Sequence, residues 1–418
     1  MRIRNCAILI AVALLATGRG VAAGDVALVG GKIYVSPTGP AIEDGVVVVR
    51  NGRIAAVGPR AQVVVPPSAE VVDCRGGVVT AGFWNCHVHF MGPAVLQAGT
   101  RDGAALSLAL EEMLTRWGFT TVFDLASSFE NTAELRRRID GGEIPGPRIL
   151  TTGEPFYPKD GTPIYVRGFY AAHRLPSAEV ATADEARARV RRQVGAGVDG
   201  VKLFAGSFVE GWKILPMPDD VARAIADEAH AAGRPVFAHP SNPVGIDVAL
   251  RSGVDVLAHT TSVGGPWPPE LVARLTAARV ALVPTLSLFG IELKKSGASP
   301  ADTERVLETV VAQLRAFAAG GGQVLFGTDV GYTQQHDTTE EFTLMARAGL
   351  DFQAILAALT TAPAERFQRA GELGRIAPGY LADLVVLEAD PAEDITAFAR
   401  VRRTVREGRV VYSRAGHR

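Results

Sequence analysis

The sequence is short of cysteine and of net charge, and both shortages narrow the classes of protein to which it can belong. Only 3 of its 418 residues are cysteines, and 43 Lys plus Arg balance 44 Asp plus Glu. Because the positive and negative charges nearly cancel, the chain has no general attraction for nucleic acid or for an anionic membrane surface. No low-complexity segment interrupts the chain, and the composition favours a globular protein that acts on a small molecule or a short peptide.

The first residues have the pattern of a cleavable secretory signal peptide, residues 1–23. Arg2 and Arg4 precede an almost wholly apolar run from Ala7 to Ala16, and small residues follow up to Ala23. The run is too short to span a bilayer comfortably, so we favour cleavage after Ala23 over a retained anchor. We therefore expect a periplasmic or secreted protein with no stable membrane anchor once the signal has been removed.

The mature chain would keep only Cys74 and Cys86. Two cysteines are too few for the disulfide framework of a small secreted domain. One bridge between them is an open alternative, but two buried thiols are the interpretation that we favour.

Short strands are expected at both ends of the chain. Residues 24–80 contain several, among them a hairpin with its turn at Asn51-Gly52, and residues 373–418 contain two more around Glu407-Gly408. These dipeptides are typical of tight turns between strands. Each set is too small to form a stable sheet alone, so we expect the two ends to form one small β-sandwich domain.

Residues 81–372 alternate between apolar β-runs and helical patterns. Such alternation is typical of parallel strands joined by crossover helices. Eight units favour a closed (β/α)8 TIM barrel over an open sheet. The expected strands are 78–89, 121–125, 148–152, 200–205, 235–239, 254–259, 281–286 and 323–329.

Metal-ligand side chains end several of these runs. His87 and His89 are two residues apart, so a strand would point both to one face, where they could grip one divalent metal. His239, His259 and Asp329 end three further runs. A single strand-end histidine is more often a structural residue. However, the catalytic groups of such barrels gather at the carboxyl ends of the strands, and five ligand-type residues there favour a metal site.

Lys202 lies among apolar residues in the fourth run. Burying an ammonium group is costly, so a buried lysine needs an explanation. One explanation is that Lys202 forms a salt bridge or that its side chain reaches solvent. The explanation that we favour is a neutral amine that reacts with CO2 to form N6-carboxylysine, whose two oxygens could bridge two metals.

Together these motifs resemble the amidohydrolase superfamily, near its imidazolonepropionase-like and prolidase-like metal-dependent hydrolases. The resemblance covers the whole mature chain. It rests on the segments 78–89, 200–203, 327–329 and 374–386 and on the strand-end histidines. It is specific for the superfamily and much less so for the substrate.

The resemblance also implies a ligand set for two divalent metal ions, which we expect to be Zn²⁺. The inner ion would bind His87, His89 and Asp329, the outer ion would bind His239 and His259, and carboxylated Lys202 would bridge them. Many relatives have Asp at position 85, where this chain has Asn85. We expect Asn85 to orient the ring of His87 by a hydrogen bond.

The ligand set predicts hydrolysis. Two ions about 3.5–4 Å apart can lower the pKa of a shared water, whose hydroxide attacks a carbonyl, while Asp329 takes the proton and passes it to the leaving amine. The favoured reaction cleaves an amide C–N bond of a dipeptide, an N-acyl amino acid or a cyclic amide. A lactonase, esterase or phosphoesterase could use the same site. A binding protein without catalysis should have lost at least one ligand.

A long segment, residues 154–176, follows the third run, and we expect a loop that acts as a lid. Tyr165 and Arg167 could bind a substrate carboxylate, because arginine pairs with carboxylates through two hydrogen bonds. Tyr170, and His336 after the eighth run, are further candidates for contact with substrate. The alternative is a solvated loop whose aromatic residues pack on the barrel. The sequence leaves the oligomeric state open, and a homo-oligomer is compatible with it.

Overall fold

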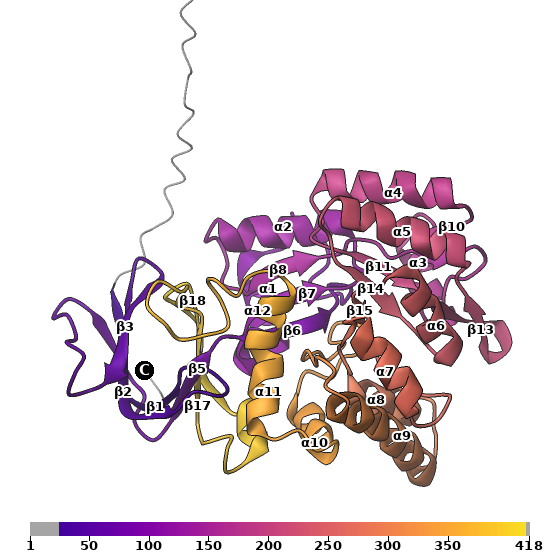
Figure 1. The fold of residues 1–418 in the computed structure, drawn as a ribbon. Coiled ribbons are helices and arrows are strands. Elements are labelled where there is room, and N and C mark those ends of the chain that lie inside the picture. The colour runs from indigo at the N-terminus through magenta and orange to yellow at the C-terminus, as the bar shows by residue number, and fades with distance from the viewer. Residues whose placement is uncertain (1–24, 415–418) are drawn as a thin grey trace, which may run out of the picture.

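Residues 25–414 of the computed structural model form an α/β protein in which a mixed sheet lies beside a larger region of parallel strands and helices (Figure 1). The predicted signal peptide lies outside these described residues. Within residues 25–414, no helix combines the length and the apolar composition needed to cross a membrane.

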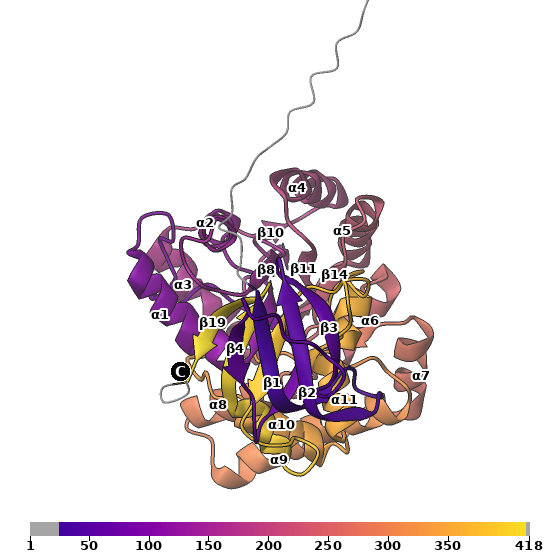
Figure 2. The same cartoon turned by 90° about the vertical axis from the view of Figure 1, so that its left-hand side faces the viewer.

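The two ends of the chain build one eight-stranded sheet, so they pack together as expected, while the β-sandwich form of this domain stays a prediction. Its order is β19-β18-β17-β5-β1-β2-β3, with β4 paired to β1, and Figure 2 shows it from its outer side. The link between the ends is the antiparallel pair β5–β17, with Leu384 opposite Ala81. The strands are β1 (Val26–Tyr34), β2 (Ala41–Arg50), β3 (Arg53–Pro59), β4 (Glu70–Asp73), β5 (Val78–Ala81), β17 (Leu384–Leu387), β18 (Val401–Arg406) and β19 (Arg409–Ser413).

Both predicted turns of this sheet are confirmed. Asn51 and Gly52 have φ angles of 50° and 75°, and Glu407 and Gly408 have 49° and 74°. Left-handed φ at both central positions is what a two-residue hairpin needs. The inward-facing side chains form a core of their own, and Cys74 within it is a free buried thiol, as is Cys86.

The parallel strands fall into two sheets. One contains β6 (Phe83–Val88), β7 (Phe119–Asp124) and β8 (Arg148–Thr151). The other contains β11 (Val201–Phe204), β14 (Val236–His239), β15 (Val256–Leu257) and β16 (Ala281–Leu282). Two short pairs lie beside them, β9 (Tyr157–Pro158) with β10 (Glu179–Val180) and β12 (Gly206–Val209) with β13 (Lys213–Pro216).

Isolated bridges cross the gaps between the two parallel sheets. Phe156 pairs with Leu203 on one side, and the segment 323–330 runs between β16 and β6 on the other. This segment is the eighth predicted run, and it contacts its neighbours through bridges and single hydrogen bonds without a regular strand. The α/β class is therefore established, while a continuous closed barrel stays a prediction.

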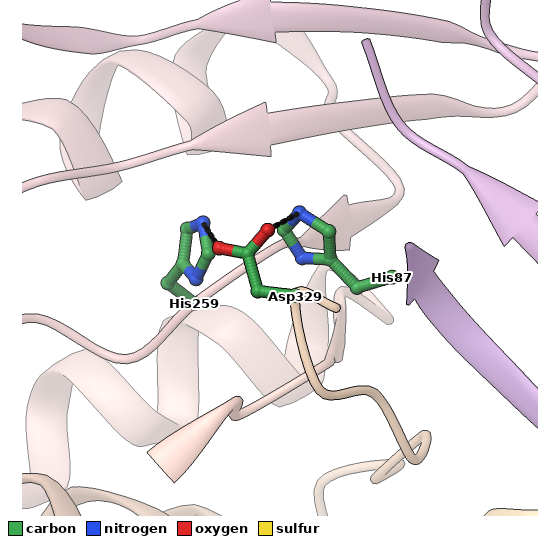
Figure 3. A group of neighbouring side chains, drawn as sticks. All are labelled: His87, His259 and Asp329. Carbon is green, nitrogen blue, oxygen red and sulfur yellow. Dashed lines mark ion pairs between the residues drawn. The ribbon is translucent and has the colours of Figure 1, made fainter. Parts of the chain in front are cut away.

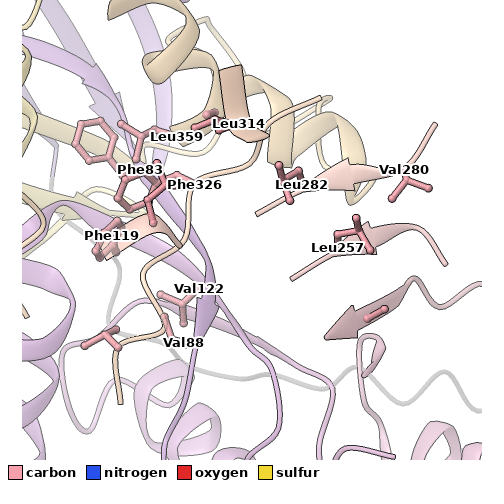
Figure 4. Close-up of a cluster of buried hydrophobic side chains, with 14 of the residues drawn as sticks. Phe83, Val88, Phe119, Val122, Leu257, Val280, Leu282, Leu314, Phe326 and Leu359 are labelled. Carbon is pink, nitrogen blue, oxygen red and sulfur yellow. The ribbon is translucent and has the colours of Figure 1, made fainter. Parts of the chain in front are cut away.

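Helices follow the parallel strands and cover the outside of this region (Figure 1). They are α1 (Gly103–Met113), α2 (Phe129–Asp140), α3 (Ile164–His173), α4 (Ala183–Ala196), α5 (Asp219–Ala231), α6 (Pro243–Ser252), α7 (Pro269–Ala277), α8 (Leu286–Lys295), α9 (Pro300–Ala319), α10 (Thr339–Arg347), α11 (Phe352–Leu359) and α12 (Thr361–Arg366). Large side chains such as Phe83, Phe119 and Phe326 pack between strands and helices (Figure 4). This packing fixes the strands, and with them the side chains at their carboxyl ends.

The prediction of one strand from 78 to 89 was wrong, because this run is two strands in two different sheets. β5 belongs to the mixed sheet and β6 to the parallel region. Gly82 joins them at a close approach, where a Cβ would lie 2.2 Å from Oγ1 of Thr120. Both halves are buried on both faces, so an apolar run alone cannot mark the change of sheet.

Candidate active site

All six predicted metal ligands lie at the carboxyl side of the parallel strands and line one cavity. His87 lies near the end of β6, and His89 follows it directly. Lys202 is in β11, and His239 ends β14. His259 follows β15, and Asp329 belongs to the segment between β16 and β6. The strand-end pattern therefore identified residues that meet in space.

His87, His89 and Asp329 form the tightest part of this cluster. Oδ1 of Asp329 lies 2.8 Å from Nε2 of His89 and 3.4 Å from Nε2 of His87. The two Nε2 atoms are 3.2 Å apart. Oδ2 of Asp329 lies 3.8 Å from Nε2 of His259. Figure 3 shows the carboxylate of Asp329 between the imidazoles of His87 and His259. One ligand atom each from His87, His259 and Asp329 lies within 4.8 Å of the others, close enough to hold one metal ion.

His239 and Lys202 extend the cluster beyond these residues. The rings of His239 and His259 are 4.5 Å apart between centroids. The other face of His239 stacks on Phe204, also at 4.5 Å and nearly parallel. Nζ of Lys202 is buried and lies 5.7 Å from the centre of the Phe204 ring. Phe204 thus packs against both groups, of which Lys202 is buried and His239 is partly exposed.

Burial keeps these side chains in the neutral forms that bind metals. It lowers the pKa of His87, His239 and His259 well below the usual value, and the neighbouring positive groups lower it further. Burial also lowers the pKa of Lys202 to about 7, against the opposing effect of Asp329. Neutral imidazole is a metal ligand, and a neutral amine is a nucleophile.

Hydrogen bonds to residues outside the cluster determine which ring nitrogen of His87 and of His259 faces Asp329. Nδ1 of His87 lies 3.0 Å from the carbonyl of Ala258, which can only accept, so Nδ1 donates. Oγ1 of Thr285 donates to the carbonyl of Pro284, so it accepts from Nδ1 of His259 at 2.7 Å. In both rings Nε2 is left with its lone pair toward Asp329, as a metal would require.

The backbone at Asp329 is in an unfavourable conformation. Its φ is 62°, in the left-handed region that residues other than glycine rarely adopt. Its N–H donates to the carbonyl of His87, and its carbonyl accepts from Thr333. Strain of this kind costs about 1–3 kcal/mol and persists where a function needs the geometry.

Two buried polar atoms in the cluster lack a hydrogen-bond partner among residues 25–414. They are Oδ1 of Asp329 and Nδ1 of His89. A buried unsatisfied polar atom costs about 1–3 kcal/mol, so a bound group that satisfies it is favoured. The converging Nε2 atoms and the unsatisfied carboxylate oxygen fit a divalent metal ion.

The cluster opens into a cavity of about 610 Å³, a volume typical of sites for drug-sized molecules. Its walls are mainly apolar and aromatic. They come from α3, α8 and the segments that follow β6, β7 and β8. Tyr165 of α3 meets Tyr332 across this cavity, with ring centroids 5.6 Å apart.

A comparison with protein-family models shows to which family a chain with this cluster belongs. Residues 78–411, which include every ligand of the cluster, match the model of the amidohydrolase family. The chain belongs to the amidohydrolase family. It is therefore a hydrolase that acts on carbon–nitrogen bonds, and the divalent-metal chemistry usual in this family fits the donor set described above.

Individual relatives are distant but extend over most of the chain. This amidohydrolase is 25% identical to ochratoxinase of Aspergillus niger in an alignment of 361 residues that covers 78% of this chain and 73% of the relative. It is 25% identical to imidazolonepropionase of Methylobacterium nodulans, over 88% and 94% of the two chains. A solved prolidase in complex with N-methylphosphonate-L-proline is 26% identical, covers 93% and 100% of the two chains, and has a TM-score of 0.76.

The segment 154–176 of this amidohydrolase is not a plain loop, because residues 164–173 form helix α3. Val166 and Tyr170 of α3 pack with Tyr157 and Phe204. Such tertiary contacts stabilise a helix that a search for long loops does not reveal. Tyr165 and Tyr170 line the cavity, as their predicted role requires.

Arg167 and His336 are not among the residues that line this cavity. Nε of Arg167 donates to the carbonyl of Thr162, and its Nη1 lies 3.6 Å from Glu210. Arg167 lines a separate surface depression. His336 lies near Glu112 and Arg116, and burial lowers its pKa. The structure therefore does not bring the predicted carboxylate-binding arginine to the site.

Asn85 acts on the backbone rather than on the ring of His87. Its Oδ1 accepts from the N–H groups of His87 and Thr328, and its Nδ2 donates to Oγ1 of Thr328. The expected contact with the imidazole is absent from the described residues because Ala258 takes it. Asn85 thus joins β6 to the segment that carries Asp329.

Asp124 is a buried residue of the site region that the sequence analysis missed. It ends β7 and accepts hydrogen bonds from Ser127, Thr132 and Thr151. Burial raises its pKa, although the hydrogen bonds from Ser127, Thr151 and Thr132 oppose this. Its signal was available, because Asp124 lies next to the end of the apolar run 121–125. Ser127, which it holds, lines the cavity.

Proposed function

We propose that this amidohydrolase is a two-metal enzyme that hydrolyses an amide bond of a small molecule, and that it acts in the periplasm or outside the cell. One observation carries the proposal. The Nε2 lone pairs of His87 and His259 converge on the carboxylate of Asp329, whose Oδ1 has no other hydrogen-bond partner within residues 25–414. A closed barrel, in which segment 323–330 takes the eighth strand position, is part of the same proposal.

Two divalent ions, which we take to be Zn²⁺, would supply Lewis acidity toward a carbonyl and lower the pKa of a water between them. His87, His89 and Asp329 would hold one ion, and His239 and His259 would hold the other. The short contacts around Asp329 and the ring pair His239–His259 support this division.

Lys202 would join the two ion sites as N6-carboxylysine. Its neutral Nζ attacks CO2, an N–C bond forms, and one proton leaves to solvent. The carbamate replaces an amine that burial disfavours in its charged form by an anion that two metal ions can share. Burial beside Phe204 would exclude water from this group.

Asp329 would move the proton in the reaction. Its carboxylate takes the proton of the attacking water and returns it to the nitrogen of the leaving amine. The left-handed backbone at residue 329 and the hydrogen bond from its N–H to His87 hold the carboxylate in place. Burial keeps it away from bulk water.

A panel of amides, N-acyl amino acids, lactones and phosphoesters tests the reaction class, with Zn²⁺ and bicarbonate present. We expect turnover of amides above the other classes. Faster hydrolysis of lactones or phosphoesters would overturn the amide assignment and favour the alternative use of the same site. No turnover of any class by the metal-loaded protein would favour a binding protein.

A further inference from the structure

Outside the metal cluster, the Asp, Glu, Lys and Arg residues that line the cavity are all acidic. Glu130, Glu154 and Glu292 line it, and among the described lining residues the only Lys or Arg is Lys202. Lys202 belongs to the metal cluster and is buried in it. The space left for substrate therefore faces three carboxylates.

Each glutamate comes from a different element. Glu130 is exposed in the first turn of α2. Glu154 follows β8, and its Oε1 accepts from the backbone N–H of Phe129. Glu292 belongs to α8 and accepts from the hydroxyl of Tyr332 at 3.2 Å. These backbone and hydroxyl donors carry no full charge, so they leave the negative charge of Glu154 and Glu292 in place.

The basic residues near these glutamates do not line the cavity. Arg189 offsets part of the charge of Glu154, and its guanidinium donates to the carbonyls of Pro155 and Ala178. Lys295 lies 3.5 Å from Glu292, and its side chain is 70% exposed. An exposed pair of this kind contributes little, about 0–1 kcal/mol. Outside the metal cluster, the acidic groups among the described lining residues therefore outnumber the Lys and Arg side chains.

The rest of the wall is mainly apolar and aromatic. Phe169, Phe208, Phe289 and Leu288 contribute to it. A wall of low polarity strengthens the effect of each charge on a ligand, because less water screens it. A free carboxylate would be repelled here without an arginine to pair with, and a protonated amine would be attracted.

We propose that the natural substrate is an aromatic or otherwise apolar amide that carries a protonated amine and no free carboxylate. This rests on the proposed amide hydrolysis and narrows it. It disfavours dipeptides with a free C-terminus and N-acyl amino acids among the candidates considered above, since both carry a carboxylate.

Three amides built on one frame test the proposal. The frame is the phenylacetyl amide of benzylamine, and its para substituent is an aminomethyl group, a methyl group or a carboxylate. The metal-loaded enzyme should show the highest kcat/KM for the aminomethyl compound and the lowest for the carboxylate. We expect at least about a tenfold difference between these two. Equal values, or a preference for the carboxylate, would overturn the proposal.

Dissociation constants of the same three compounds, measured by calorimetry, separate this inference from the proposed reaction. If none is hydrolysed, amide cleavage fails for this frame, while the order of the dissociation constants still decides the charge preference. If none binds, the proposed substrate class is wrong.

Variants identify the source of the preference. Glu154→Gln and Glu292→Gln should each lower the ratio of aminomethyl to carboxylate kcat/KM by about threefold or more. Glu270→Gln, an exposed position at the start of α7 away from the cavity, is the matched control and should keep the ratio. An unchanged ratio in both cavity variants would contradict the assignment to these glutamates.

Discussion

Two buried polar clusters in this amidohydrolase differ in how well their charges are matched. Between the mixed sheet and the parallel strands, Arg148 of β8 donates to Asp383 at 2.7 Å and to Glu407. At the carboxyl side of the same strands, His87, His89 and Asp329 lie together with two of their polar atoms unsatisfied within residues 25–414.

The difference separates a structural cluster from a binding cluster. The carboxylates raise the pKa of Arg148 against the effect of burial, so its charge is satisfied within the protein. At the histidine cluster burial instead lowers the pKa of His87 and His259, and the Nε2 lone pairs of these two rings face Asp329. Matched polar groups join parts of a fold, while unmatched ones indicate a missing ligand.

The largest expected effect on activity comes from Asp329→Asn. The amide cannot accept the proton of the attacking water, so kcat should fall by about a thousandfold. The histidines remain, so most of the bound metal should remain too. Steady-state kinetics with metal analysis of the same sample measures both. If the variant keeps activity, Asp329 does not transfer the proton.

Arg148→Met breaks the matched cluster instead. It leaves Asp383 buried without its partner, so the free energy of unfolding should fall by about 3–5 kcal/mol. Metal content and the activity of the folded fraction should hardly change, because the cluster is remote from the cavity lining. Denaturant unfolding measures the loss. The double variant Arg148→Met/Asp383→Leu should recover part of it, and no recovery would contradict the pairing.

The unmatched cluster should make the stability of the metal-free protein depend on pH. The pKa of Lys202 is about 7 when folded and near its usual 10.5 when unfolded. Between these values the unfolded chain binds more protons, so stability should rise with pH from about 7 to 10.5. Unfolding of the metal-free protein across this range measures the slope. Lys202→Met should remove this contribution, and the same slope in the variant would refute it.

The smallest expected effect is that of Arg167→Met. Arg167 is a surface residue whose partners lie outside the cavity. Its replacement should change kcat/KM by less than about twofold, as is usual for surface substitutions away from a site. A tenfold loss on any amide substrate would return Arg167 to the substrate site that the sequence suggested.

The ligand cluster could be predicted from the sequence because one rule connects it to the fold. Parallel strands end at the same edge, so His239, His259 and Asp329 could be placed together from the ends of their apolar runs. The sharing of one sheet by the two chain ends followed in the same way from segments too small to stand alone.

The helix within segment 154–176 could not be predicted, since its structure depends on tertiary packing. Val166 and Tyr170 lie on a helix that packs against Tyr157 of the same segment and against Phe204 of β11. On a helix successive residues turn by about 100°, so Tyr165 and Arg167 point in very different directions. Only the folded helix decides which of them faces the cavity. The change from one sheet to the other within residues 78–89 could not be predicted for a similar reason, because an apolar run does not indicate with which strand it pairs.

The metal content of the purified protein tests the central claim most directly. The account predicts about two divalent ions per chain when Zn²⁺ and bicarbonate are supplied, and fewer in the Lys202→Met variant, which cannot form the bridging carbamate. A single ion in both proteins, or none in either, would contradict the two-metal site.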